Sequence, residues 1–376
     1  MPNAQHQPPR VLHVITPSRM AGAETFLVRL VRRTGNGGTV HRCATSRSAA
    51  NAEMRVAGID FDTLLISGKA NLLAVPRLAR AVRRHKIDVL HSHLSTASWW
   101  CGWLEQLGGP PSIGHVHGFT SALWHRRQTH LIACSGAVKQ DLIAKGFSAE
   151  RITVMHYPVD PDDIRSQRSP LDVRTELGVS ADTPIIGTFA HLSLKKGYRE
   201  LVRAAEIVLR RMPTAQFWCS GEGALRAELE ETARSMGIAD RFKLLGFRRD
   251  VPDLMRAVDV MCLPSHREPF GLVYVEAALA EKPVIACNAG GASEIIMHGE
   301  TGLLVPPPAA EKPTNVAALA EAILKVLDNR DRAREMGRRG RELALERFTW
   351  PRYLEQLNAL YSRVLDRELP SIQKAA

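Results

Sequence analysis

The chain has 376 residues, of which 45% are hydrophobic and 24% are charged, and its formal net charge is +11. This length exceeds one ordinary hydrophobic core and fits two domains of typical size. No apolar stretch reaches the ~18 residues of a membrane span, and MPNAQHQPPR (1–10) lacks the apolar centre of a secretory signal, so we expect a cytoplasmic protein.

Cysteine usage supports the same compartment. Six cysteines are spread along the chain and form no CxxC pair, which argues against a disulfide framework and against a zinc site. They are Cys43, Cys101, Cys134, Cys219, Cys262 and Cys287.

The basic charge is concentrated in the first half of the chain. Residues 1–165 carry 20 Lys and Arg against 11 Asp and Glu, notably in RLVRR (29–33) and RLARAVRRHK (77–86). These runs are either solvated helix faces or a surface that meets anionic lipid headgroups or an acidic acceptor. A nucleic-acid partner is disfavoured, because no nucleic-acid motif and few aromatic residues accompany them.

Apolar runs alternate with amphipathic patterns over residues 10–159. Strands are predicted at 10–16, 87–93, 112–118, 130–135 and 152–159, and helices at 23–34 and 135–146. Residues 160–184 are polar and rich in Pro and Asp. We therefore expect an N-terminal domain over 1–165 and a linker region over 166–184.

The alternation restarts after residue 184. Strands are predicted at 185–192, 215–221, 242–247, 258–265 and 282–290, and helices at 197–212, 224–236, 251–257 and 271–281. Two such series predict an α/β protein of two doubly wound, Rossmann-like parallel-sheet domains facing a cleft, the second over 185–350. Residues 306–315 read as a surface loop. The last segment, 351–376, has an amphipathic helix without a strand of its own, so we expect it to pack across the domain junction.

The stretch HREPFGLVYVEA (266–277) places Glu268 and Glu276 around a Pro-Phe-Gly step. Pro269 suits a first helical turn, Gly271 allows close approach of a ligand, and the helix N-terminus favours a diphosphate. Two carboxylates at its ends can accept hydrogen bonds from sugar hydroxyls, so the stretch predicts a nucleotide-sugar site. The alternative is a helix with an acidic first turn and one exposed glutamate.

The stretch EPFGLVYVE also resembles the E-x7-E motif of the family 4 retaining glycosyltransferases, which have the GT-B fold. Other segments resemble the same family in the same order, from about residue 10 to 365. They are SRMAGAETFL (18–27), DVLHSH (88–93), GHVHG (114–118), AHLSLKKG (190–197), CSGEGALRAELE (219–230), LGFRRDVPDLM (245–255), GGASEII (290–296), GETGLLVPP (299–307) and FTW (348–350).

The resemblance implies roles for individual residues. Glu276 would bind the nucleotide ribose, Glu268 the hydroxyls of the donor sugar, and Lys196 the departing diphosphate. Backbone near Phe247–Arg248 would read the base, and His117 would lie over the sugar ring. Catalysis is thus assigned to Glu268, Lys196 and His117, and the remaining donor-binding positions are Gly22, His191, Gly221, Phe270, Gly271 and Leu272.

Three features qualify this interpretation. His191 stands where the family usually has an arginine, and imidazole cannot hold phosphate in a permanent two-bond grip. His91, His93, His115 and His117 end two neighbouring strands. For them, contacts with backbone or substrate are favoured over a metal site. The Asp-x-Asp of IDFD (59–62) is read as a strand edge and not as the metal motif of other glycosyltransferases.

The sequence thus predicts a retaining, metal-independent transferase that moves a hexosyl group from a nucleotide diphosphate sugar, with UDP favoured, to an acceptor hydroxyl. No further cofactor is expected. The acceptor is a lipid-linked sugar, a lipopolysaccharide or a small metabolite, as in cell-surface polysaccharide or glycolipid synthesis. Peripheral attachment to the inner membrane face would follow from the basic N-terminal domain. The alternatives are a nucleotide-sugar 2-epimerase and a non-catalytic protein that binds sugar nucleotides.

Overall fold

The computed structural model describes residues 8–16, 22–34, 39–48, 50–66, 68–307 and 315–366. Residues 18–21 of the predicted glycine loop and residues 308–314 of the predicted surface loop lie outside the described residues. The chain divides into two compact units. The first unit comprises Met1–Tyr157 and Pro351–Ala376, and the second comprises Pro158–Trp350.

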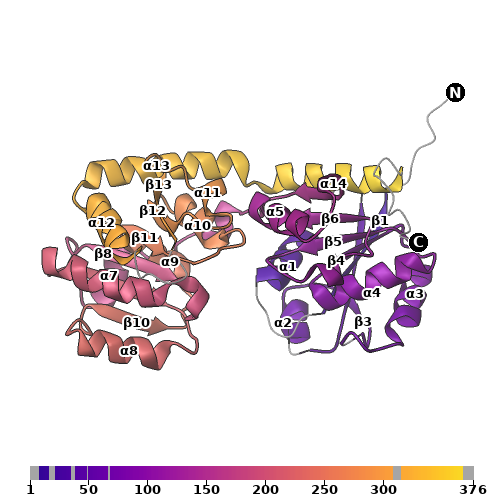
Figure 1. The fold of residues 1–376 in the computed structure, drawn as a ribbon, viewed down its shortest axis with the longest axis horizontal. Helices are drawn as coiled ribbons and strands as arrows, with labels where there is room; N and C mark the ends of the chain where they lie inside the picture. The colour runs from indigo at the N-terminus through magenta and orange to yellow at the C-terminus, as the bar shows by residue number, and fades with distance from the viewer. Residues whose placement is uncertain are drawn as a thin grey trace. The chain divides into compact units, whose positions relative to one another are not determined.

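The first unit is built on a parallel sheet with the order β3-β2-β1-β4-β5-β6-β7 (Figure 1). Its strands are short and largely buried, as expected where helices cover both faces. They are β1 (Arg10–Ile15), β2 (Val40–Thr45), β3 (Phe61–Thr63), β4 (Val89–His93), β5 (Ser112–Val116), β6 (His130–Ala133) and β7 (Ile152–Val154).

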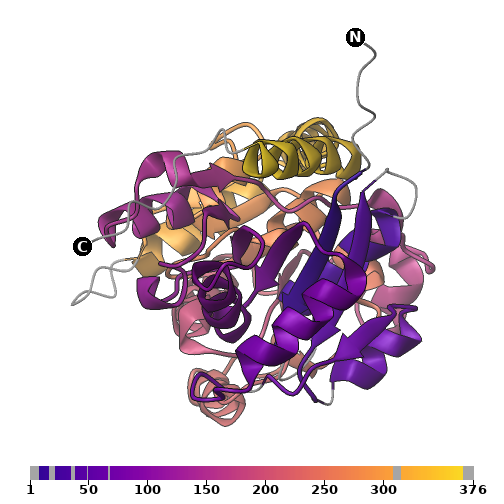
Figure 2. The same ribbon diagram turned by 90° about the vertical axis from the view of Figure 1, so that its right-hand side faces the viewer.

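Helices flank this sheet (Figure 2). The long ones are α1 (Gly22–Thr34), α2 (Ala50–Val56), α3 (Ala74–His85), α4 (Ser95–Gln106), α5 (Gly136–Ala144) and α14 (Trp350–Leu365), and short 3₁₀ turns are η1 (Ala122–Trp124) and η2 (Ala149–Arg151). Alternation along β1 decides which residues meet which helices. Leu12 and Val14 pack with the buried residues of α3 and α4, whereas His13 points to the opposite face.

The second unit has its own parallel sheet, in the order β10-β9-β8-β11-β12-β13 (Figure 1). Its strands are β8 (Ile185–Phe189), β9 (Gln216–Ser220), β10 (Phe242–Gly246), β11 (Val260–Leu263), β12 (Val284–Cys287) and β13 (Gly302–Val305). Its helices are α6 (Pro170–Glu176), α7 (Tyr198–Arg211), α8 (Arg226–Ser235), α9 (Val251–Ala257), α10 (Leu272–Leu279), α11 (Ala292–Ile295), α12 (Asn315–Leu327) and α13 (Arg330–Arg347), with 3₁₀ turns η3 (Pro161–Ile164) and η4 (Leu194–Lys196).

These two sheets confirm the predicted architecture of two Rossmann-like domains. All six cysteines are buried. Asp62 of IDFD lies in β3, where its carboxylate is 2.5 Å from His85 Nε2, so the structure uses it in an ion pair. Among the described helices, none combines the length and the apolar composition needed to cross a membrane.

The predicted linker, 166–184, is part of the second unit and not a connection between domains. Its Pro and Asp content predicts a linker, but Ser169 and Pro170 begin a helix: Ser169 Oγ accepts the Asp172 N–H at 3.1 Å, and Pro170 opens α6. The predicted first domain, 1–165, is correspondingly too long, because the second unit begins at Pro158.

Arg174 explains why this polar segment is ordered. Its guanidinium is buried and donates to the carbonyls of Ala257, Ala181 and Thr183 at 2.8, 2.6 and 2.9 Å, and it pairs with Asp259 at 3.0 Å. One side chain therefore joins α6 to the end of α9 and to the start of β8.

We predict that Arg174→Met destabilises the second unit by about 2–3 kcal/mol, because it leaves the carbonyls of Ala257, Ala181 and Thr183 without this donor, and a buried acceptor left unpaired costs ~1–3 kcal/mol. The measurement is urea unfolding followed by circular dichroism. Arg210→Met is the matched control, since Arg210 forms an exposed pair with Glu206 on α7 and its loss should cost less than ~1 kcal/mol. Equal shifts for the two variants would contradict this role for Arg174.

Candidate donor-binding site

The strand order in the sheet of the second unit reverses between β8 and β11. From these two neighbouring strands, later strands are added outward on either side. Side chains that follow their carboxyl ends meet at one point, where α/β sheets of this type bind ligands. The loop after β8 carries His191 and Lys196, and the loop after β11 carries Glu268 and Gly271. The structure therefore brings together residues that lie more than 70 positions apart.

Lys196 and Glu268 form an ion pair across these two loops. The Lys196 Nζ donates to Glu268 Oε2 at 2.7 Å, and the Ser265 hydroxyl donates to the same oxygen at 2.9 Å. Glu268 is buried, whereas the Lys196 side chain is about one quarter exposed, at 26%. An accessible cation is thus held by a buried carboxylate, which suits it for an anionic ligand.

The backbone around Glu268 is packed too closely for side chains. The Gly291 N–H donates to the Glu268 carbonyl at 2.8 Å, and a Cβ atom at Gly290 would lie 1.9 Å from that carbonyl oxygen. Gly271 precedes α10 with φ +100°, and a Cβ atom there would lie 2.3 Å from the Tyr274 ring. These contacts fix the turn that carries Glu268 into α10.

Helix α10 begins at Leu272, close to the predicted position, and carries Glu276 in its second turn. Leu272 and Glu276 are both half-buried. Phe270 is buried and packs edge-on against Phe348, with 5.7 Å between ring centroids, so its side chain belongs to the core. Of Phe270, only the backbone is left for a ligand.

The loops after β9 and β10 meet the loop after β8. The Gly221 N–H donates to the Gly246 carbonyl at 2.8 Å, and a Cβ atom at Gly221 would lie 2.0 Å from the Ala190 carbonyl oxygen. The loops that follow β8, β9 and β10 are therefore in contact. His191 is exposed beside them, and Phe247 is exposed after β10, at 73%.

The side chain of Arg248 is engaged in hydrogen bonds with two carboxylates of the protein. Its guanidinium donates to Asp250 at 2.6 and 2.8 Å and to Glu176 of α6 at 3.1 Å, and these hydrogen bonds raise the pKa of Arg248. The side chain of Arg248 is thus engaged, and the reading of a base by the backbone at residues 247–248 stays a prediction.

The predicted residues Gly22 and His117 belong to the first unit. Gly22 is the exposed first residue of α1, and a Cβ atom there would meet nothing within 4 Å among the described residues. His117 follows β5, and both of its ring nitrogens have partners: Nε2 lies 3.0 Å from His93 Nδ1, and Nδ1 is hydrogen-bonded to the Tyr157 hydroxyl. A ligand of His117 would meet a ring whose nitrogens are already engaged.

This contact is one end of a chain of hydrogen-bonded imidazoles. His117, His93, His13 and His41 are joined in that order at 3.0, 3.1 and 2.7 Å. Burial lowers the pKa of His117 to about 3 and that of His41 to about 4, so both are neutral at pH 7. His13 and His41 are not among the residues predicted from the sequence. His13 lies in a predicted strand, and the alternation of side chains along that strand could have placed it on one face of the sheet.

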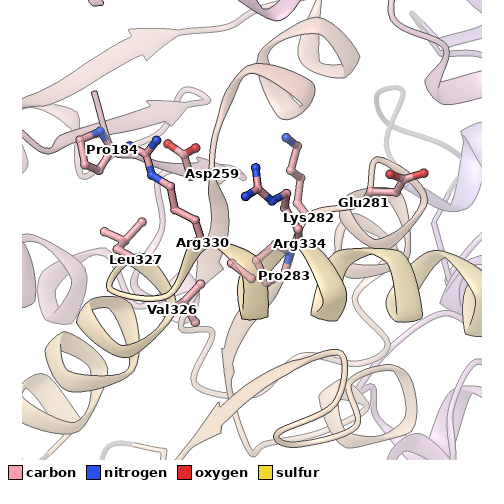
Figure 3. A pocket seen from close by; sticks show the side chains of 10 residues that line it. Pro184, Asp259, Glu281, Lys282, Pro283, Val326, Leu327, Arg330 and Arg334 are labelled. Carbon is pink, nitrogen blue, oxygen red and sulfur yellow. The ribbon is translucent and has the colours of Figure 1, made fainter. Parts of the chain in front are cut away.

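The cavity shown in Figure 3 lies elsewhere on the second unit. Its volume is about 240 Å³. Its lining includes Pro184, Asp259 and Pro283, which directly precede β8, β11 and β12, respectively. Its position at the edge opposite Lys196 and Glu268 separates it from the candidate donor site.

Both units match models of known protein families. Residues 20–163 match the model of Glycosyltransferase Family 4, and residues 172–343 match that of the Glycosyl transferases group 1. The chain is 31% identical over 309 residues to a D-inositol 3-phosphate glycosyltransferase of Corynebacterium diphtheriae, covering 73% of this chain and 70% of the relative. It is 30% identical over 284 residues to the alpha-maltose-1-phosphate synthase of Mycolicibacterium smegmatis, covering 69% of each.

The structure is similar to that of Anabaena HepE solved in complex with UDP, with a TM-score of 0.82, 25% identity, and coverage of 94% of this chain and 99% of the other. These matches span both units, and they agree with the order of motifs and with the paired sheets. The chain belongs to the glycosyltransferases of family 4, with the GT-B fold, and it is a glycosyltransferase.

Proposed function

We propose that the protein is a retaining, metal-independent transferase that moves a hexosyl group from a UDP-linked sugar to an acceptor hydroxyl. The observation that carries this proposal is the Lys196–Glu268 ion pair at the carboxyl ends of β8 and β11, in which Glu268 belongs to the stretch that resembles the E-x7-E motif. UDP is favoured because the similar HepE structure holds UDP. The matched relatives are transferases and synthases, which supports transfer over epimerisation.

On this proposal, the acceptor oxygen bonds to the anomeric carbon on the face from which the β-phosphate oxygen departs. The acceptor's proton passes to that departing oxygen, so no enzyme nucleophile is used. Lys196 supplies positive charge as the diphosphate leaves, and Glu268 accepts hydrogen bonds from sugar hydroxyls. The Lys196–Glu268 pair must then loosen when the donor enters, since both groups turn to the ligand.

His191 sets a limit on this site. It is exposed in the loop after β8, where the family resemblance leads us to expect an arginine. Imidazole lacks the permanent charge and the forked donors of a guanidinium, so Lys196 carries more of the diphosphate's charge than it would beside an arginine. The proposal therefore depends strongly on Lys196.

We predict that Lys196→Ala lowers kcat by a factor of about 10² to 10³, because the charge it supplies matters most as the diphosphate departs. Its donor affinity should change much less, by under about tenfold. Initial rates and donor titration measure the two quantities. Lys195→Ala is the matched control, since Lys195 is exposed and adjacent. Equal losses in kcat and in affinity would contradict this role.

We also predict that calorimetric titration in EDTA detects one nucleotide class among UDP, GDP and ADP sugars, with UDP expected. Glu276→Ala should weaken that binding about tenfold to a hundredfold, the value of a charge-assisted hydrogen bond of ~1.5–3 kcal/mol to the ribose. Glu346→Ala, on the exposed side of α13, is the control. If the wild-type protein binds none of the three, the site does not hold a nucleotide sugar.

A membrane surface is proposed as the place where the first unit meets its acceptor. Leu72 and Leu73 are 83% and 58% exposed immediately before α3, and Arg80 and Arg83 are exposed along that helix. Exposed leucines beside arginines suit an anionic bilayer, where the leucines enter the interface and the arginines meet headgroups. The acceptor would then be attached to a lipid.

We predict that the protein sediments with vesicles containing anionic phospholipid at low salt and is released at high salt. Arg80→Gln/Arg83→Gln should reduce this binding by about thirtyfold, since each of the two basic residues contributes ~1 kcal/mol near such a surface. Arg210→Gln/Arg211→Gln, on α7 of the second unit, is the control pair. Salt-independent binding, or equal loss in both pairs, would contradict a docking role for α3.

A further inference from the structure

One face of the sheet in the first unit carries a set of buried histidines. His13 of β1 pairs in register with His91 of β4, and His93 follows His91 by two residues, so all three side chains stand on one face. Each is fully buried, at 0% exposed. One ring nitrogen from each lies within 4.8 Å of the others, and no carboxylate or thiolate of the described residues joins this group.

Hydrogen bonding accounts for only part of this group. His13 Nδ1 and His93 Nε2 face each other at 3.1 Å. His91 Nε2 is buried and has no hydrogen-bond partner among the residues that the structure describes. Three nitrogens thus converge on one place, and their mutual contacts leave one of them without a partner. A buried nitrogen in this state points to a bound species that would satisfy it.

The outward nitrogen of each of the three rings has its own partner. His13 Nε2 lies 2.7 Å from His41 Nδ1, and His93 Nδ1 lies 3.0 Å from His117 Nε2. His91 Nδ1 lies 2.7 Å from the Tyr361 hydroxyl of α14. A histidine that ligates a metal with one nitrogen typically donates its other N–H in this way, and that hydrogen bond fixes both the tautomer and the ring orientation.

We propose that His13 Nδ1, His91 Nε2 and His93 Nε2 bind one transition-metal ion of the Zn²⁺ class. In this assignment His13 donates Nε2–H to His41, His91 donates Nδ1–H to Tyr361, and His93 donates Nδ1–H to His117. Each ligand nitrogen then carries no proton and directs its lone pair toward the ion. Neutral imidazoles favour Zn²⁺ and its neighbours, whereas Mg²⁺ and Ca²⁺ prefer oxygen ligands.

A second group, His93, His115 and His117, is a weaker candidate. Its nitrogens also lie within 4.8 Å of one another. However, neither ring nitrogen of His115 has a hydrogen-bond partner among the described residues, so nothing there orients this ring as a ligand. The fixed tautomers therefore favour the group of His13, His91 and His93.

The ion would be structural and separate from the proposed sugar transfer. Its ligands come from β1 and β4, and its outer contacts reach β2 through His41 and α14 through Tyr361. It would therefore tie the C-terminal helix to the centre of the first sheet. This inference does not depend on the proposed donor, and donor binding is expected to tolerate brief exposure to EDTA.

The first experiment is elemental analysis of the untagged full-length chain, with about one equivalent of zinc expected per chain. The protein is then unfolded with a chelator and refolded with Co²⁺, whose visible absorption bands report nitrogen ligands in a four-coordinate site. Competition against a chelating dye gives the affinity. Thermal unfolding with and without the ion should show a higher Tm for the loaded protein.

Three variants locate the ion. His91→Gln should abolish the Co²⁺ bands, and Tyr361→Phe should weaken affinity about tenfold to a hundredfold because it removes only the outer oxygen. His130→Gln is the control, since His130 is also buried, with one nitrogen bonded to Thr153 and the other without a partner among the described residues. It should bind the ion as the wild type does.

Two results would overturn the proposal. One is wild-type protein that is folded, contains no stoichiometric metal and refolds with Co²⁺ without the bands, which would mean that water or empty space occupies the histidine group. The other is Co²⁺ affinity that is unchanged in both His91→Gln and Tyr361→Phe, which would place the ion elsewhere. Because Tyr361→Phe keeps the packed ring, it remains informative if His91→Gln fails to fold.

Discussion

A parallel sheet delivers all its strand-to-helix loops to one edge, and this constraint organises the second unit. Glu268 and Lys196 meet because β8 and β11 are neighbours at the point where strand order reverses. The close packing of Gly290 against the Glu268 carbonyl and the left-handed turn at Gly271 then fix the carboxylate's position. On the proposed mechanism, Lys196 and Glu268 separate to meet the donor, while this rigid backbone keeps both residues where the diphosphate would depart.

The sequence was sufficient for the architecture and for several residues that the structure brings together at the candidate donor site. Periodicity predicted most of the described strands, since both sheets are buried and their apolar runs are clear, but it missed several helices, among them α4 and α13. It also failed over 166–184, where Arg174 is buried and pairs with Asp259, which lies outside this segment. Local composition cannot distinguish such a segment from a linker, because two partners of Arg174, the Ala257 carbonyl and the Asp259 carboxylate, lie 83 and 85 positions away.

The histidine group shows a different limit. His91, His93, His115 and His117 were visible as a cluster of strand ends, but their partners were not. His13 is placed beside His91 by strand register. Tyr361 is 270 residues away from His91 in the chain and reaches it only because α14 packs in the first unit. Long-range pairing of this kind leaves no local pattern.

The contact between His91 and Tyr361 also has a consequence for synthesis on the ribosome. The first unit needs α14 to cover its histidine face, and Tyr353 and Tyr361 of that helix are almost fully buried there. The ribosome makes residues 158–350, the whole second unit, before this helix emerges. The N-terminal sheet must therefore remain incomplete while the other unit is translated, and its buried polar face is closed only by the last part of the chain.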